Sequence, residues 1–164
     1  AAYSAEGVKV KKCEMVLSSQ QRLAGLKHLN RLEQVLARQE WADEYQEGLM
    51  SDLKGDIIEG VMSNVFIVEK GIVRTPLIKH SGVKGIMRDR VLKLCEAHGI
   101  MVVEDNISFE QVLAADEVFL TNSIIGIWPV NQIANQTYTP GLITKNIMKF
   151  LTEKYSVDYV TPGL

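Results

Sequence analysis

A repeated pattern of short apolar segments joined by glycine turns, between residues 48 and 75, constrains the fold of this chain more than any other feature. Each pair of segments flanks a Lys-Gly turn, the first pair being Gly48 to Leu53 and Ile57 to Glu59, and the second Asn64 to Glu69 and Ile72 to Thr75. Short segments of this kind separated by glycine turns are typical of β-hairpins. The sequence therefore predicts a run of short antiparallel strands.

The remaining elements follow from hydrophobic spacing and from capping residues, among them Ser108 with Gln111 as a capping box and Gly99 as a helix-ending glycine. We expect strands at about residues 8–17, 100–103 (buried), 117–121 and 125–130, and helices at about 28–41, 85–98, 108–115 and 142–155. Strands outnumber helices, and hairpins are frequent. The sequence thus predicts a mixed α/β fold whose largely antiparallel or mixed sheet curves into a barrel-like core, and not a doubly wound Rossmann sheet.

Composition limits the classes of partner. The 164 residues are 46% hydrophobic and 23% charged, which is typical of one soluble domain. The 18 basic and 20 acidic residues give a net charge of −2, so we expect no nucleic-acid or membrane partner and a small-molecule ligand held by a local site. Cys13 and Cys95 are too few for a disulfide framework, and no apolar run reaches transmembrane length. These features indicate a cytoplasmic protein.

Lys27 is the first candidate functional residue. It lies between Leu26 and Leu29 at the junction of the first expected strand and the following helix. Apolar neighbours that partly desolvate an amine favour its neutral, nucleophilic form. An ordinary surface lysine fits the same local pattern, and local features alone favour that interpretation.

Glu59 is the second candidate. It ends an expected strand and is followed by Ser63 and Asn64, so it places a carboxylate beside a ligand while the two polar residues organise the loop. A plain hairpin with polar turn residues is the alternative.

Two further segments are suited to binding an anion. The glycine-rich stretch from Ser81 to Gly85 leads into an expected helix, whose first N–H groups at Ile86 and Met87 form an anion site, although its spacing is not that of a dinucleotide fingerprint. Thr121-Asn122-Ser123 ends a strand with three hydrogen-bonding side chains and is suited to complete a phosphate site.

In this order, the four segments resemble the class IV aminotransferase family, the pyridoxal-phosphate enzymes of fold type IV. The stretch from Gly25 to Leu36 most closely resembles the aminodeoxychorismate lyase branch of that family. The resemblance covers essentially the whole chain. It implies the larger, C-terminal pseudo-barrel domain of that fold.

The resemblance also implies a role for each site residue. Lys27 stands where the family has its Schiff-base lysine, which is also the catalytic base, and Glu59 where it has the acid that pairs with the pyridine nitrogen. Met87 replaces a threonine that many aminotransferases have, so only its amide remains to bind phosphate. The expected pyridoxal-phosphate site comprises Lys27, Glu59, Ser63, Asn64, Gly85, Ile86, Met87, Asn122 and Ser123, with no metal.

The activity implied is the conversion of 4-amino-4-deoxychorismate to 4-aminobenzoate and pyruvate. The alternatives are a D-amino-acid or branched-chain aminotransferase and, in another class, a non-catalytic binding domain. Residues 1–164 are expected to form one domain, the lysine-bearing part of a two-domain enzyme whose smaller N-terminal domain is absent, since Lys27 lies near the start and Ala1 is not Met. By itself the chain should bind the cofactor weakly and be inactive, and the parent enzyme should be a homodimer.

Overall fold

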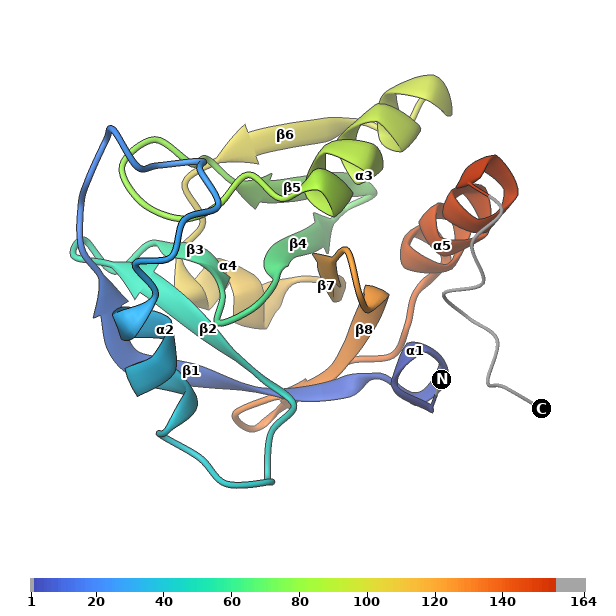
Figure 1. Cartoon of the computed structure of the whole chain (residues 1–164). Helices are drawn as coiled ribbons and strands as arrows, with labels where there is room; N and C mark the ends of the chain where they lie inside the picture. The colour runs from blue at the N-terminus through green and yellow to red at the C-terminus, as the bar shows by residue number, and fades with distance from the viewer. Residues whose placement is uncertain (1, 156–164) are drawn as a thin grey trace.

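Nine strands and five helices make up residues 2–155, the part of the chain that the computed structural model describes (Figure 1). The strands are β1 (Val8–Leu17), β2 (Glu47–Asp52), β3 (Ile57–Gly60), β4 (Asn64–Glu69), β5 (Ile72–Pro76), β6 (Val102–Asp105), β7 (Glu117–Asn122), β8 (Gly126–Ile133) and β9 (Gln136–Thr137). The helices are α1 (Ala2–Glu6), α2 (Leu32–Arg38), α3 (Ile86–Ala97), α4 (Phe109–Ala114) and α5 (Leu142–Tyr155).

All the strands join one curled sheet in the order β3-β2-β1-β8-β7-β4-β5-β6, and β9 pairs with β8. β1 runs parallel to both of its neighbours, and β5 runs parallel to β6, while the other pairs are antiparallel. Both predicted hairpins are present, as β2–β3 and β4–β5. The predicted mixed α/β fold with a curved, barrel-like sheet is therefore confirmed.

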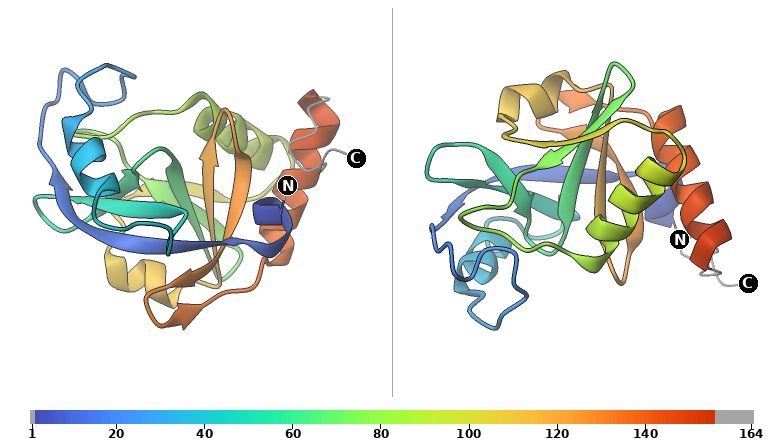
Figure 2. Two further views of the ribbon diagram at one scale, coloured as in Figure 1. Left: turned by 60° about the horizontal axis from the view of Figure 1, so that its bottom comes forward. Right: turned by 90° about the horizontal axis from the view of Figure 1, so that it is seen from above.

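Alternating side chains of the central strands build two separate cores. Val65 and Ile67 of β4 point into a cluster that includes α4, whereas Phe66 and Val68 point into a cluster with α3 and α5. This alternation is the period of two that a strand imposes. As a result α3 and α5 lie side by side on one face of the sheet (Figure 2). Within residues 2–155 no helix has the length and apolar character needed to cross a membrane.

The helix predicted at residues 28–41 is shorter than expected, because α2 begins only at Leu32 and ends at Arg38. Gly25, with φ of +85°, donates its N–H to the Gly82 carbonyl and accepts from the Lys84 N–H. These bonds attach the segment to another part of the chain, so it stays non-helical up to the start of α2. The apolar residues at helical spacing therefore do not form a buried face, and Leu29 is fully exposed.

Two other differences concern the edges of the sheet. The strand expected to be buried at residues 100–103 is β6, which begins two residues later and is half-buried to exposed, because it is an edge strand that pairs only with β5. The sequence analysis also missed α1, a helix of five residues. By contrast, α3, α4 with its Ser108–Gln111 capping box, and α5 lie where they were predicted.

We predict that Phe119→Ala lowers the free energy of unfolding by about 3–5 kcal/mol. Phe119 is fully buried and stacks on Phe66 with a centroid separation of 4.9 Å, so truncation leaves a large cavity. Leu53→Ala, at a position that is 73% exposed, serves as the control and should change stability by at most about 0.5 kcal/mol. Urea denaturation measures both, and a loss below about 1 kcal/mol for Phe119→Ala would contradict this packing.

Candidate active site

One cavity of about 360 Å³ brings together residues that are far apart in the sequence. All nine residues predicted for the site line it, namely Lys27, Glu59, Ser63, Asn64, Gly85, Ile86, Met87, Asn122 and Ser123. The cavity also contains Arg31, Met62, Val83, Lys84, Thr121 and Ile124, which the predicted set did not include. Its volume lies in the range of small-molecule binding pockets.

Lys27 reaches the cavity from the loop between β1 and α2. The hydrogen bonds of Gly25 to Gly82 and Lys84 hold this loop beside the segment that precedes α3. The side chain of Lys27 is exposed, and so is that of Leu26, so the apolar neighbours do not desolvate the amine, as the surface-lysine interpretation of the local pattern predicted. The amine is therefore accessible from the cavity without prior rearrangement.

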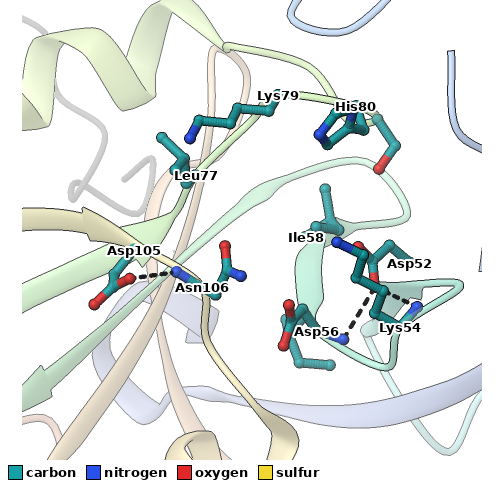
Figure 3. A pocket seen from close by; sticks show the side chains of 11 residues that line it. Asp52, Lys54, Asp56, Ile58, Leu77, Lys79, His80, Asp105 and Asn106 are labelled. Atoms are coloured by element: carbon teal, nitrogen blue, oxygen red, sulfur yellow. Dashed lines mark hydrogen bonds between the residues drawn. The ribbon is translucent and has the colours of Figure 1, made fainter. Parts of the chain in front are cut away.

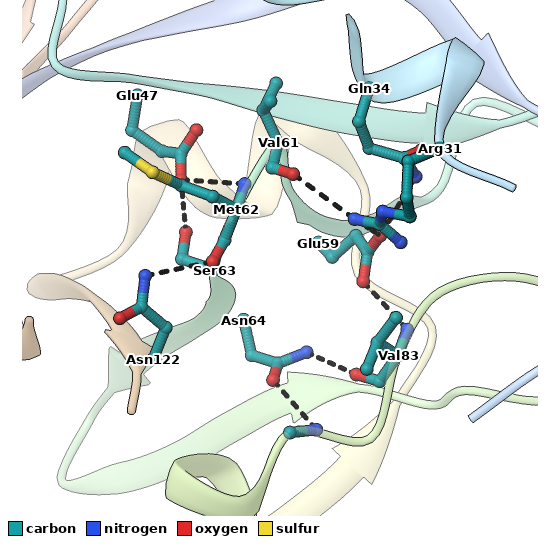
Figure 4. Close-up of polar contacts among 11 residues, drawn as sticks. Arg31, Gln34, Glu47, Glu59, Val61, Met62, Ser63, Asn64, Val83 and Asn122 are labelled. Carbon is teal, nitrogen blue, oxygen red and sulfur yellow. Dashed lines mark hydrogen bonds and ion pairs between the residues drawn. The ribbon is translucent and has the colours of Figure 1, made fainter. Parts of the chain in front are cut away.

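Glu59 supplies a buried carboxylate, only 2% exposed (Figure 4). Its Oε2 accepts the N–H of Val83 at 2.8 Å, and its Oε1 lies 3.4 Å from the Gln34 amide nitrogen and 3.6 Å from the Arg31 guanidinium. Burial raises the pKa of Glu59, while the Val83 N–H, Arg31, Gln34 and Lys27 act in the opposite direction. A cationic group of a ligand beside this carboxylate would stabilise its charged form, which burial has removed from water.

Asn64 fixes the start of α3. Its amide nitrogen donates to the Val83 carbonyl at 2.7 Å, and its side-chain oxygen accepts the Gly85 N–H at 3.1 Å (Figure 4). A Cβ at Gly85 would collide with the Asn64 side-chain oxygen, so glycine is required for this approach. The N–H groups of Ile86 and Met87 lie in the first helical turn and have no intrahelical acceptor, which makes this end of α3 suited to an anion.

The end of β7 contributes three polar residues that differ in what they offer to a ligand. The side-chain oxygen of Asn122 accepts the N–H groups of Ile124 and Ile125, and its amide donates to the Met62 carbonyl at 3.0 Å, so its side chain is occupied by protein contacts. Thr121 is fully buried, and its hydroxyl has no hydrogen-bond partner among the described residues. Ser123 lines the cavity and is exposed.

Three residues that sequence reasoning missed support this site from behind. Arg31 and Gln34 contact Glu59, and Glu47 accepts a hydrogen bond from the Ser63 hydroxyl. The spacing of three between Arg31 and Gln34 is a helical signal that they share a side of the chain. No comparable signal marks Glu47, because the burial of a carboxylate depends on its tertiary partners.

Two other cavities lack the predicted residues. One of about 160 Å³ lies between the β2–β3 turn and residues 77–81, and mixes acidic Asp52, Asp56 and Asp105 with basic Lys54, Lys79 and His80 (Figure 3). Another, of about 60 Å³, has the buried and unpartnered His28 Nδ1, Gln34 Oε1 and Ser81 Oγ among its lining residues. Within residues 2–155 no cluster of His, Cys, Asp and Glu is arranged to hold a metal ion.

Comparison with known proteins agrees with this geometry. The model of the family described as amino-transferase class IV matches residues 1–133, which include every residue of the cavity. The chain belongs to the class IV aminotransferase family. Members of this family are enzymes that depend on pyridoxal phosphate.

Individual class IV relatives fall into two activity groups. An aminodeoxychorismate lyase from Vibrio harveyi is 38% identical over 81% of this chain and 49% of its own length. A putative branched-chain-amino-acid aminotransferase from Methanocaldococcus jannaschii is 37% identical over 79% of this chain and 45% of its own length. The crystal structure of 4-amino-4-deoxychorismate lyase from Pseudomonas aeruginosa superposes with a TM-score of 0.92 at 39% identity, over 95% of this chain and 58% of that chain. The chain thus spans about half the length of the curated relatives it matches.

We predict that Glu59→Gln changes the pH dependence of stability. Burial raises the pKa of Glu59 above its ordinary value of 4.5, so its contribution to stability is full below pH 4.5 and is lost as pH rises through the folded-state pKa. Relative to Glu59→Gln, the wild-type chain should therefore lose stability as pH rises from 4.5 toward neutrality. Urea denaturation across this range measures it, with Glu96→Gln at an exposed position as the control. Parallel curves for wild type and Glu59→Gln would contradict the assignment.

Proposed function

We propose that the 360 Å³ cavity binds pyridoxal 5′-phosphate through Lys27, Glu59 and the start of α3. The residues suit the group chemically, since the cavity combines an accessible amine, a buried carboxylate, a helix N-terminus and the unpartnered Thr121 hydroxyl. Lys27 would attach the aldehyde carbon, and Glu59 would pair with the ring nitrogen. The amides of Ile86 and Met87, together with Ser123, would hold the phosphate.

Each group has a defined task in the reaction. When bound, pyridoxal phosphate withdraws electrons from the carbon that carries the substrate amino group. The Glu59 carboxylate is buried and held by the Val83 N–H, and it would stabilise positive charge on the ring nitrogen of the cofactor. Lys27 is placed to accept a proton from the amino-bearing carbon as general base and to return one as its conjugate acid.

The proposed reaction is the lyase conversion of 4-amino-4-deoxychorismate to 4-aminobenzoate and pyruvate. Lys27 removes the proton from the amino-bearing ring carbon, the bond to the enolpyruvyl oxygen breaks, and a proton added to the released enolpyruvate gives pyruvate. The ring becomes aromatic, so atoms and electrons balance without an external oxidant. The match to the Pseudomonas aeruginosa lyase, at a TM-score of 0.92 and 39% identity, carries this proposal.

The second candidate is amino transfer on the same site, with a branched-chain or D-amino acid as donor. The 37% identity to the putative aminotransferase from Methanocaldococcus jannaschii supports it. The two activities separate in one assay of the purified product of the natural gene. Release of 4-aminobenzoate and pyruvate from 4-amino-4-deoxychorismate identifies the lyase, and transfer that requires an added 2-keto acid identifies the aminotransferase.

We further propose that this chain is the lysine-bearing part of a two-domain, cytoplasmic enzyme. Its span of about half the length of its curated relatives supports the first point, and the free, buried Cys13 and Cys95 support a reducing compartment. The intact mass of the product of the natural gene tests the domain proposal. A mass well above that of the 164 residues agrees with it, and an equal mass contradicts it.

We predict that Lys27→Ala, made in the product of the natural gene, abolishes the visible absorbance of protein-bound pyridoxal phosphate and reduces turnover by several orders of magnitude. The substitution removes both the point of attachment and the base. Lys84→Ala is a matched control, because Lys84 lines the same cavity but is given no covalent role. A band that persists in Lys27→Ala and disappears in Lys84→Ala would contradict attachment to Lys27.

We also propose that the enzyme is a homodimer and predict that Leu29→Asp weakens it. Large apolar side chains between residues 26 and 36 lie exposed, including Leu26 at 56%, Leu29 at 100% and Leu32 at 65%. Such a patch is typical of a protein interface. Light scattering after size exclusion should show a dimer for the wild type and a larger monomer fraction for Leu29→Asp. A monomeric wild type, or an unchanged dimer in the variant, contradicts the proposal.

A further inference from the structure

Glu47, the first residue of β2, is a carboxylate with only 1% exposure that the proposed chemistry does not use. It does not line the cofactor cavity, but it contacts the loop that does. Its Oε2 accepts the Ser63 hydroxyl at 2.7 Å and the Met62 N–H at 3.2 Å, and its Oε1 accepts the N–H of Gly48 at 2.9 Å (Figure 4). One buried carboxylate thus receives donors from two consecutive residues of the β3–β4 loop.

Three further backbone groups of this loop, residues 61–63, are also paired with other elements. The Val61 N–H donates to the Gly48 carbonyl at 2.9 Å, and the Val61 carbonyl accepts from Arg31 at 3.3 Å. The Met62 carbonyl accepts from Asn122 at 3.0 Å. The loop is therefore held by β2, by the residue that precedes α2 and by the end of β7.

Atoms pack closely around the Glu47 carboxylate. A Cβ at Gly60 would collide with the Ser63 hydroxyl and lie 3.0 Å from the Glu47 carboxyl carbon. Burial raises the pKa of Glu47, whereas the donors from Gly48, Ser63 and Met62 act to lower it. The loop donors and the carboxylate therefore stabilise each other, and removing either leaves a buried polar group unsatisfied.

We propose that Glu47 is a positioning residue that fixes the 61–63 loop as one wall of the cofactor cavity. Met62 and Ser63 form this wall, and Met62 in turn holds Asn122 at the end of β7. Because the Ser63 hydroxyl donates its hydrogen bond to Glu47, it presents only acceptor lone pairs to the cavity. This inference rests on the proposed function, since it assumes that the cavity binds pyridoxal phosphate.

The test is Glu47→Gln in the full chain, with Asp52→Asn as the matched control. Asp52 lies on the same strand and its carboxylate also accepts two backbone N–H groups, those of Lys54 and Asp56, but outside this cavity. The amide in Glu47→Gln places a donor where the loop already supplies donors. We expect hydrogen exchange at the Met62 amide to become about ten-fold faster and pyridoxal-phosphate affinity about ten-fold weaker, neither of which Asp52→Asn should reproduce.

Unchanged Met62 exchange in Glu47→Gln, or weakened affinity of the same size in Asp52→Asn, would overturn the positioning role. If Glu47→Gln fails to fold, Glu47→Asp replaces it, because the shorter side chain keeps the charge but draws the carboxylate away from the Met62 and Ser63 donors. That variant should weaken affinity and speed Met62 exchange, and unaltered affinity together with unaltered exchange would count against the proposal. A visible absorbance band of bound cofactor that survives Lys27→Ala would instead refute the proposed function, while Met62 exchange still reports on Glu47.

Discussion

The hydrogen bond from the Val83 N–H to the buried Glu59 carboxylate joins the two sides of the cavity, and the surrounding geometry depends on it. Glu59 ends a strand of the β2–β3 hairpin, and Val83 belongs to the segment that leads into α3. Gly82, with φ of +84°, turns this segment in a space where a Cβ would collide with Ile58. An ionised carboxylate at this depth needs such a donor, and the Val83 N–H is the shortest of its contacts at 2.8 Å.

The polar residues around the cavity divide into those that face a ligand and those that hold the wall. The Asn64 side chain binds backbone groups of the segment just before α3. The Asn122 side chain binds backbone groups of the β3–β4 and β7–β8 connections. The groups that remain to meet a ligand are Lys27, Glu59, Ser123, the first amides of α3 and the Thr121 hydroxyl. A family signature therefore contains residues of both kinds, and only the hydrogen bonds distinguish them.

Local signals predicted the elements whose boundaries depend on local chemistry. Glycine turns marked both hairpins, the Ser108–Gln111 capping box marked α4, and Gly99 with φ of +67° follows α3 as expected. Elements that depend on distant contacts were less predictable. The start of α2 was misplaced because the bonds between Gly25 and residues 82–84 attach the preceding segment to another part of the chain and keep it non-helical.

The same division holds for the site. The resemblance of four motifs selected residues that the structure brings into one cavity, although their individual roles stay proposals. Glu47 and the contacts of Arg31 and Gln34 with Glu59 were not predicted, since nothing in the sequence states that two carboxylates will be 1% and 2% exposed. Tertiary burial, and not residue type, turns these side chains into parts of the site.

Two lysines, Lys27 and Lys84, line the cavity, and we propose that Lys27 is the one that carries the cofactor. Reductive trapping of pyridoxal phosphate on the product of the natural gene, followed by peptide mass mapping, tests this most directly. The account predicts one pyridoxyl group, on the peptide that contains Lys27. Label on Lys84, label spread over surface lysines, or no label at saturating pyridoxal phosphate would contradict it.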